Sequence, residues 1–282
     1  FIELTRLKKP IGFMLLFWPC IWGLTLVYDF NSSINNYFFF SLLFLAGSIL
    51  MRSAGCIVND IADKNFDQKV ERTKNRPIAS GKVSVKLALI YSIALCGLAF
   101  LVLINFNKFT IYMALLSMPL AFTYPLMKRI TYWPQLFLGV TFNYGLVLAW
   151  ISVSNDLSLV SIAFYVGAIF WTLGYDTIYG FQDIKDDEII GVKSTSIKFK
   201  NDPKKFLLFC YMLFLISLIF VGIKMNFKFY YFIFLTLPTV QLLIFQIKNL
   251  KISNTFDCLS KFKSNNFLGM IVLINIFIGK LI

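Results

Sequence analysis

Acidic residues gather in two short segments of an otherwise apolar chain. Of the 14 Asp and Glu residues, nine lie between Asp60 and Glu71 or between Asp176 and Glu188. Each segment comes at the end of a long apolar run. Carboxylates that share a small volume of low dielectric constant repel one another unless a cation neutralises them. The two segments therefore indicate a binding site for polyvalent cations.

Each acidic segment contains a pair of aspartates at the same spacing. Asp63 and Asp67 are four residues apart, as are Asp183 and Asp187, and the second pair follows the first by 120 residues. On a helix, residues at this spacing lie on one face, about 5 to 6 Å apart. Asn59 adds a further oxygen one turn before Asp63. We predict that the two pairs face each other and hold metal ions between them.

The types of ligand select the ion. Carboxylate and amide oxygens without His or Cys favour a hard cation, and a site completed by phosphate oxygens suits Mg²⁺. The chain has no His, which excludes every imidazole-based triad or dyad, and its five Cys residues are scattered, as structural apolar residues are. Basic residues beside the aspartates are what a diphosphate bridged by metal requires. These candidate diphosphate ligands are Arg72, Lys128, Arg129 and Lys193.

Other polar residues lie deeper in the apolar runs. Asp176 precedes Asp183 by seven residues, or about 10 Å of helix, where an unpaired charge is costly. Tyr179 lies between them on the same predicted helix face. Arg52 sits inside an earlier run, where it either snorkels, pairs with Asp60 or contacts a substrate.

A further polar group ends the fourth apolar run. The segment from Tyr124 to Arg129 contains Pro125 and two cations, and it either stops a helix at the membrane surface or belongs to the site.

These polar groups must be positioned by membrane-spanning helices. The chain is 58% hydrophobic with a mean hydropathy of +0.74, far above soluble domains, and short alternating strand patterns typical of an outer-membrane barrel are absent from the sequence. A helix needs about 20 apolar residues to cross about 30 Å of hydrocarbon. Nine runs meet this requirement: 11 to 29, 38 to 59, 86 to 106, 108 to 127, 134 to 152, 157 to 181, 206 to 223, 228 to 247 and 266 to 282.

The positive charges support both the count and an orientation. With nine spans, 22 of the 27 Lys and Arg residues fall on the face that carries the N-terminus and both acidic segments. Short basic loops stay in the cytoplasm, so we expect the N-terminus and the site inside and the C-terminus outside a bacterial-type inner membrane. The net charge of +13 then reflects topology and contact with the lipid bilayer, and no nucleic acid partner is expected.

The repeated aspartate pairs also predict the internal organisation. The first pair ends the second span and the second pair ends the sixth, so a four-helix unit occurs twice and a ninth helix follows. We therefore expect an all-α polytopic membrane bundle that forms one domain over residues 1–282, with the site between the two halves. Because the chain begins with Phe1 rather than Met, we also expect residues before it.

The chain resembles the UbiA-type intramembrane aromatic prenyltransferases, and among them the 4-hydroxybenzoate polyprenyltransferases of ubiquinone biosynthesis. The resemblance extends nearly end to end, although Gly180 and Val192 stand where the family commonly has Ala and Ile. It is carried by four motifs in the family's order: Arg52-x2-Gly55-x3-Asn59-Asp60-x2-Asp63-x3-Asp67, Arg72-Thr-Lys-Asn75-Arg76-Pro77-Ile-Ala-Ser-Gly81, Tyr124-Pro-x2-Lys128-Arg129, and Asp176-Thr177-x-Tyr179-x3-Asp183-x2-Asp186-Asp187-x3-Gly191-Val-Lys193-Ser194-Thr195.

The resemblance implies a Mg²⁺-dependent transfer of a polyprenyl group from polyprenyl diphosphate to 4-hydroxybenzoate. It places Mg²⁺ on Asn59 and the two aspartate pairs, which would be the catalytic carboxylates. It also places the diphosphate on the four basic residues named above. The aromatic acid would lie near Arg52, Tyr124, Asp176 and Tyr179.

Three alternatives remain at this stage. A sister enzyme of the menaquinone or haem O type shares the bare NDxxDxxxD pattern. An ion-coupled transporter also has repeats and intramembrane acids, but here both pairs lie at one membrane face and no broken span adjoins them. An alcohol phosphotransferase would have Gly and an Ala-Arg pair between its aspartates, and this chain has neither.

Overall fold

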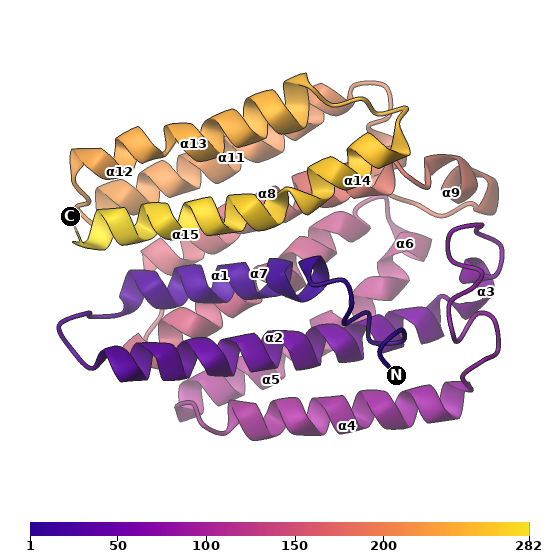
Figure 1. Cartoon of the computed structure of the whole chain (residues 1–282), viewed down its shortest axis with the longest axis horizontal. Helices are drawn as coiled ribbons and strands as arrows, with labels where there is room; N and C mark the ends of the chain where they lie inside the picture. Colours follow the sequence, from indigo (N-terminus) through magenta and orange to yellow (C-terminus); the bar gives the residue numbers. More distant parts are fainter. Residues whose placement is uncertain (282) are drawn as a thin grey trace.

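The computed structural model describes residues 1–281, in which long helices lie side by side in one bundle (Figure 1). No β-strand occurs among these residues. The long helices are α1 (Ile11–Val27), α2 (Ile34–Ala62), α4 (Val85–Leu103), α5 (Lys108–Thr123), α7 (Pro134–Ser154), α8 (Leu159–Gly180), α11 (Pro203–Lys224) and α15 (Asn265–Leu281).

Shorter helices either continue the long ones or lie in the connections. The segments after α5 and before α15 extend those helices almost without a break, and α12, α13 and η2 together form one rod. These elements are α3 (Lys64–Asp67), η1 (Tyr124–Leu126), α6 (Met127–Ile130), α9 (Ile184–Ile190), α10 (Thr195–Lys198), α12 (Phe229–Phe234), α13 (Thr236–Val240), η2 (Gln241–Lys248) and α14 (Thr255–Lys263).

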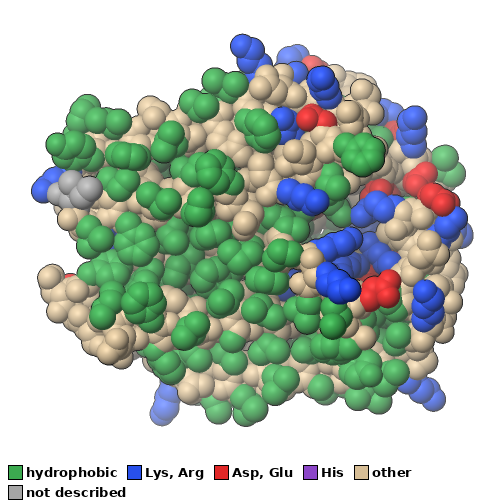
Figure 2. All heavy atoms as spheres, in the orientation of Figure 1, with side chains coloured by type: hydrophobic (Ala, Val, Ile, Leu, Met, Phe, Trp, Pro, Cys, Tyr) green, Lys and Arg blue, Asp and Glu red, His purple; other side chains and the backbone are tan. Residues whose placement is uncertain are grey.

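The number of spans agrees with the sequence prediction. Within residues 1–281, eight helical stretches are long and apolar enough to cross a membrane, and α1 is a shorter apolar helix of 17 residues. Together they match the nine predicted runs. Apolar side chains cover most of the flank of the bundle, whereas Lys, Arg, Asp and Glu gather at one end (Figure 2). The chain is a multi-pass membrane protein.

The last span begins earlier than predicted, and the eighth differs in its type of helix. The last predicted span began at residue 266, but the helical stretch begins at Thr255 with α14, an amphipathic helix that carries Asp257, Lys261 and Lys263. Because α14 carries these charges, it is not part of an apolar run in the sequence. The eighth span ends in η2, which is a π-helix, and hydropathy does not distinguish this hydrogen-bonding pattern from an α-helix.

The two halves of the chain meet at the centre of the bundle. Helix α1 packs against α7, α2 and α15, and α7 packs against α8, which in turn packs against α11. Helix α2 of the first half and α8 of the second both run toward the charged end (Figure 1). The short helices α3 and α9, which follow them, lie at that end. The paired aspartates of the repeat therefore come to the same end of the molecule.

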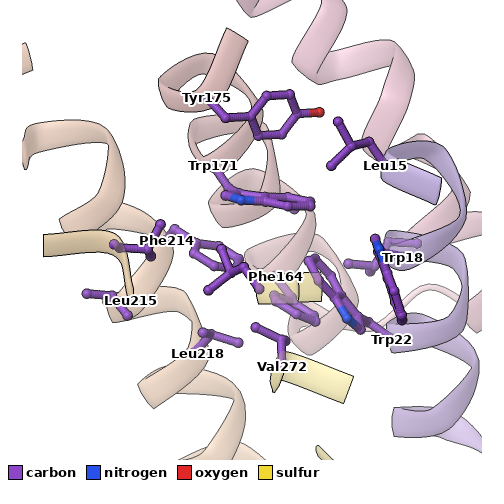
Figure 3. Packing of buried hydrophobic residues seen from close by; sticks show 14 of the residues in the cluster. Leu15, Trp18, Trp22, Phe164, Trp171, Tyr175, Phe214, Leu215, Leu218 and Val272 are labelled. Carbon is purple, nitrogen blue, oxygen red and sulfur yellow. The ribbon is translucent and has the colours of Figure 1, made fainter. Parts of the chain in front are cut away.

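An aromatic cluster holds the centre together. The rings of Trp22, Phe164, Trp171 and Phe214 are buried and pack on one another, with centroids 5.0 to 6.4 Å apart (Figure 3). Close ring packing of this kind contributes more than its buried area alone. The cluster joins α1, α8 and α11, so it fixes α8 beneath the charged end.

Candidate active site

A cavity of about 270 Å³ opens at the charged end of the bundle. Its wall is built from both halves of the chain, and it brings together residues that lie more than 100 positions apart. Twelve of the residues singled out from the sequence line it: Arg52, Asn59, Asp63, Asp67, Arg72, Tyr124, Lys128, Asp176, Tyr179, Asp183, Asp187 and Lys193.

Each aspartate pair lies on a short helix that follows a long one. Helix α2 ends at Ala62, so Asp63 caps α3, and the amide of Asp67 donates to the carbonyl of Asp63 at 2.8 Å. In the second half Asp183 caps α9, and the amide of Asp187 donates to its carbonyl at 2.9 Å. The four-residue spacing therefore gives the same one-turn arrangement in both halves, although the turn is separate from the membrane span.

Asp63 is buried and only partly neutralised. Its Oδ2 accepts from the Asn59 amide at 3.1 Å and lies 2.5 Å from the Lys128 ammonium. Its Oδ1 is buried without a hydrogen-bond partner among the described residues. Burial raises the pKa of Asp63 above its ordinary value, while the charge of Lys128 acts in the opposite direction. An additional cation at Oδ1 would stabilise the ionised form.

Asp67 is held by an arginine from the following loop. The guanidinium of Arg76 donates to Asp67 at 2.7 Å and to Asp60 at 3.1 Å. Asp60 is 2% exposed and also forms an ion pair with Arg6. Asp60 is not among the described residues that line the cavity, so it supports the wall from behind.

In the second pair, one carboxylate is bound to a cation and the other is not. Asp183 receives both Nε and Nη2 of Arg72, and Nη1 of the same guanidinium donates to the Tyr179 hydroxyl at 2.7 Å. Asp187 has no ion-pair partner within residues 1–281. Burial, together with the nearby charge of Asp183, raises the pKa of Asp187 to about 6. This carboxylate is thus another group that a cation would stabilise.

The donor set fits a hard divalent cation. All four carboxylates and the Asn59 amide line one cavity, and Asp63 Oδ1 is unpartnered there. In the described part of the chain no three acidic, Cys or His side chains converge on a single point that could hold a metal ion. Arg72, Arg76 and Lys128 pair with the aspartates instead. All four aspartates line one cavity, with these basic groups bound to three of them, and a metal bound here would need ligands from its substrate. That the two pairs hold metal between them stays a prediction.

The remaining two basic candidates are bound to the backbone. Lys193 lines the cavity, but its ammonium donates to the Ile130 carbonyl at 3.1 Å. Arg129 is exposed, donates to the Ala62 carbonyl at 2.5 Å and lies over the Phe66 ring. Arg129 is the one candidate from the sequence that the described cavity wall does not include.

The deep part of the cavity contains Arg52 and aromatic residues. The guanidinium of Arg52 lies over the Phe142 ring, 5.2 Å from its centroid, and passes so close to Gly12 that a Cβ there would lie 2.9 Å from Nε. Arg52 forms no ion pair with any described residue. It does not pair with Asp60, which was one of the three interpretations left open by the sequence.

Tyr124 and Asp176 line the same deep region from opposite halves. Tyr124 lies in η1, where α5 continues toward α6, and Asp176 lies in the last turns of α8. Asp176 has no ion-pair partner within residues 1–281 either. The cavity thus has an outer part rich in paired charges and a deeper part with one unpaired cation, one unpaired acid and several rings.

Several wall residues were missed by the sequence analysis. Arg6 and Arg76 line the cavity, as do Gln135, Tyr175 and Phe262. Arg6 had been counted only as a topology signal, and Arg76 had been quoted in a motif but given no role in the site. Phe262 lies in α14, which was not predicted, and it packs on the Tyr179 ring at 4.5 Å. No spacing in the sequence connects these residues with the aspartates.

The chain is similar to known proteins over almost its whole length. Residues 16–271 match the sequence model of the UbiA prenyltransferase family. A "4-hydroxybenzoate polyprenyltransferase, mitochondrial" of Caenorhabditis elegans is 42% identical, covering 96% of this chain and 76% of that protein. The protein of the same name from Bos taurus is also 42% identical, covering 100% and 75%. A "4-hydroxybenzoate geranyltransferase 2" of Lithospermum erythrorhizon is 40% identical, covering 100% and 90%.

Solved structures share the fold at lower identity. The apo structure of a UbiA homolog from Aeropyrum pernix K1 is 23% identical with a TM-score of 0.72, covering 96% of both chains. A UbiA homolog from Archaeoglobus fulgidus bound to GPP and Mg²⁺ is 18% identical with a TM-score of 0.70, covering 98% and 97%. These likenesses show the fold, and the family match with the curated relatives shows the class of enzyme. The chain belongs to the UbiA prenyltransferase family and is a membrane prenyltransferase.

Proposed function

We propose that the chain transfers a polyprenyl group from polyprenyl diphosphate to 4-hydroxybenzoate, at the ring carbon ortho to the hydroxyl. The reaction depends on Mg²⁺, releases diphosphate and serves ubiquinone biosynthesis. The observation that carries this proposal is the single cavity in which both aspartate pairs and their basic partners lie above Arg52. The names of the curated relatives support the acceptor, and the GPP and Mg²⁺ bound by the Archaeoglobus homolog support the donor.

The outer part of the cavity is proposed to bind the diphosphate. Asn59 with the four paired aspartates would hold Mg²⁺, which when bound supplies positive charge for the leaving diphosphate. Arg72 and Lys128 already reach Asp183 and Asp63, so their donors lie where phosphate oxygens would arrive. Preorganised cationic donors of this kind stabilise negative charge that develops in the transition state.

Lys193 and Arg129 are proposed to act at the edge of this region. The backbone amide of Lys193 donates to the Lys128 carbonyl at 2.9 Å, which keeps the two lysines together, and its ammonium can exchange the Ile130 carbonyl for phosphate. Arg129 instead holds the end of α2 through Ala62. Because Asp63 follows Ala62 in the chain, we propose that Arg129 helps to hold Asp63 in place.

The deep part of the cavity is proposed to bind the aromatic acid. Arg52 is a cation without an acidic partner among the described residues, which suits the carboxylate of the acceptor. Tyr124, Tyr179 and Asp176 surround the space between Arg52 and the aspartates. The ring of the acceptor would then lie with its hydroxyl toward the diphosphate end.

The reaction then follows from this placement. The allylic C–O bond breaks as diphosphate leaves, and the ring carbon ortho to the phenol oxygen attacks the allylic carbon. A carboxylate or a diphosphate oxygen takes the ring proton, which restores aromaticity. The faces of the surrounding rings favour positive charge on the allylic group, and a cavity enclosed by helices excludes the water that would trap it.

The orientation in the membrane is also part of the proposal. The excess of Lys and Arg at the charged end supports an N-terminus and a site in the cytoplasm and a C-terminus outside, in a bacterial-type inner membrane. The names of the animal relatives include the word mitochondrial, so a mitochondrial membrane is the alternative location. Labelling of single cysteines at Ser80 and Asn226 with an impermeant reagent, in sealed right-side-out vesicles, tests the orientation, because only the second is expected to react.

The function is tested with a panel of acceptors. Membranes that contain the protein are incubated with Mg²⁺, a polyprenyl diphosphate and several aromatic acids, and the products are identified by mass. The proposal expects prenylated 4-hydroxybenzoate as the main product. A prenylated naphthoate would assign the chain to a sister enzyme, whereas Mg²⁺-driven flux in liposomes without any prenylated product would indicate a transporter.

A further inference from the structure

A buried hydroxyl without a partner lies in the deep part of the cavity. Tyr175 on α8 is 1% exposed and lines the cavity, yet its hydroxyl has no hydrogen-bond partner within residues 1–281. The hydroxyl of Thr172, one turn earlier, already accepts from the Asn143 amide at 2.7 Å. Buried polar groups in native proteins nearly always have a hydrogen-bond partner. We therefore expect this hydroxyl to bind a partner that enters the cavity.

The ring of Tyr175 is fixed by its neighbours. Trp171 packs against it edge-on with centroids 5.0 Å apart, and Phe262 does the same from α14 at 5.8 Å. In Figure 3 the hydroxyl points toward Leu15 of α1, which lines the same cavity. The donor is therefore held in one position, as a group that orients a ligand must be.

The surroundings of this hydroxyl favour an anionic partner. Arg52, the unpaired cation, lines the same deep region. Both Arg52 and Tyr175 offer donors, and neither is bonded to an acceptor side chain of the described residues. Asp176 follows Tyr175 directly and lines the same cavity, with its side chain roughly 100° further round the helix axis.

We infer that the Tyr175 hydroxyl donates a hydrogen bond to the carboxylate of the aromatic acid that Arg52 holds. This inference rests on the proposed function and adds a residue to its acceptor site. Tyr175 lies five residues, or about 8 Å of helix, before the end of α8 at Gly180, and Asp183 comes three residues after that end. The carboxylate would thus be fixed at the bottom of the cavity and the reacting ring carbon left closer to the diphosphate.

The substitution Tyr175→Phe tests the inference, because it removes only the hydroxyl. We expect the KM for 4-hydroxybenzoate to rise about tenfold or more, the size expected for one hydrogen bond to a charged group. The KM for polyprenyl diphosphate should change less than about twofold, since that substrate has no carboxylate. The midpoint of thermal unfolding should stay equal or rise, because no bond within the protein is lost.

Tyr211→Phe is the matched control from the same aromatic core. Its hydroxyl is buried, donates to Gln246 Oε1 at 2.5 Å and does not belong to the described cavity wall. This variant should lower the unfolding midpoint and leave the KM for the acceptor unchanged. The two tyrosines therefore give opposite results if one hydroxyl serves the substrate and the other serves the fold.

A comparison of inhibitors tests the partner itself. 4-Hydroxybenzamide has the shape of the acid but no charge, and in Tyr175→Phe the preference for the acid over the amide should fall about tenfold. Equal weakening of both ligands, an unchanged KM for the acid, or a clear drop in unfolding midpoint would each overturn the assignment of Tyr175. A wild-type protein that forms no prenylated hydroxybenzoate would overturn the proposed function and this inference together, whereas an active wild type with an unaffected Tyr175→Phe overturns the inference alone.

Discussion

Arg72 and Asp183 are 111 residues apart in the chain, yet the guanidinium of Arg72 binds both carboxylate oxygens of Asp183, with Nε 2.8 Å from Oδ1. Arg72 follows the first aspartate pair, and Asp183 begins the second. Lys128, at the end of the first half, pairs with Asp63 of the same half, and its carbonyl accepts from the Lys193 amide of the second half at 2.9 Å. The site is therefore assembled only where the two halves meet, as expected for a site between repeats.

The two-point contact between Arg72 and Asp183 gives the first prediction. Arg72→Lys keeps the charge but cannot bind two oxygens of Asp183 and the Tyr179 hydroxyl at once. We expect kcat/KM for polyprenyl diphosphate to fall about 10- to 100-fold, because geometry is lost while charge remains. Product formation followed by mass spectrometry measures this. An Arg72→Lys enzyme as fast as the wild type would show that the two-point contact has no role in the reaction.

The paired aspartates give the second prediction. Asp63→Asn and Asp187→Asn each preserve shape and remove one metal-binding charge, so turnover should fall at least about 100-fold. The bundle should remain folded, as judged by its elution volume in detergent.

Asp202→Asn is the control for these two variants. Asp202 lies on the same charged end, but it is exposed, and its one ion pair among residues 1–281 is with Lys205, at 2.9 Å. Its activity should equal that of the wild type. Near-normal turnover in both Asp63→Asn and Asp187→Asn would refute the assignment of these carboxylates.

Asp60 behaves differently from the other aspartates of its motif. It is buried, binds Arg6 and Arg76, and lies outside the described cavity wall. Asp60→Asn leaves two arginines without their shared acid, so we expect the free energy of unfolding to fall by about 2 to 3 kcal/mol. Thermal unfolding in detergent checks this, and the residual activity should keep the same dependence on Mg²⁺.

A double variant tests whether Arg6 acts through Asp60. Because the two residues contact each other, Arg6→Gln combined with Asp60→Asn should lose less stability than the sum of the single losses. Strict additivity would mean that the N-terminal segment is held by other contacts, such as the buried Leu4.

Arg52 gives a prediction on substrate binding. Arg52→Gln removes the unpaired cation of the deep cavity, and the KM for 4-hydroxybenzoate should rise at least about tenfold, as expected for a lost charged hydrogen bond. The KM for polyprenyl diphosphate should change much less. Steady-state kinetics with each substrate varied in turn measures the difference, and an equal rise in both constants would place Arg52 at the diphosphate instead.

The sequence alone predicted the elements that repeat. Asp63 and Asp67 share their spacing and their position after a span with Asp183 and Asp187, and this symmetry led to the shared cavity. Apolar length predicted the spans, because the bilayer sets that length. Both features are local or periodic, so they can be read without a structure.

Other features could not be predicted because they depend on packing between distant segments. The pairing of Asp60 with Arg6 and Arg76 needs three segments to meet, and Arg6 alone reads as a charge at the membrane surface. The Tyr175 hydroxyl has no hydrogen-bond partner among the described residues. A sequence pattern cannot show that a partner is absent. Phe262 was missed because α14 is amphipathic and shorter than a span.

Removal of the metal tests the central claim most directly. The purified protein is incubated with 4-hydroxybenzoate and polyprenyl diphosphate, first with a chelator and then with increasing Mg²⁺, and prenylated product is measured by mass. We predict no product in the chelator and full recovery as Mg²⁺ is restored, because the aspartates and the diphosphate would share the ion. Product formed at the same rate in the presence of the chelator would contradict this prediction.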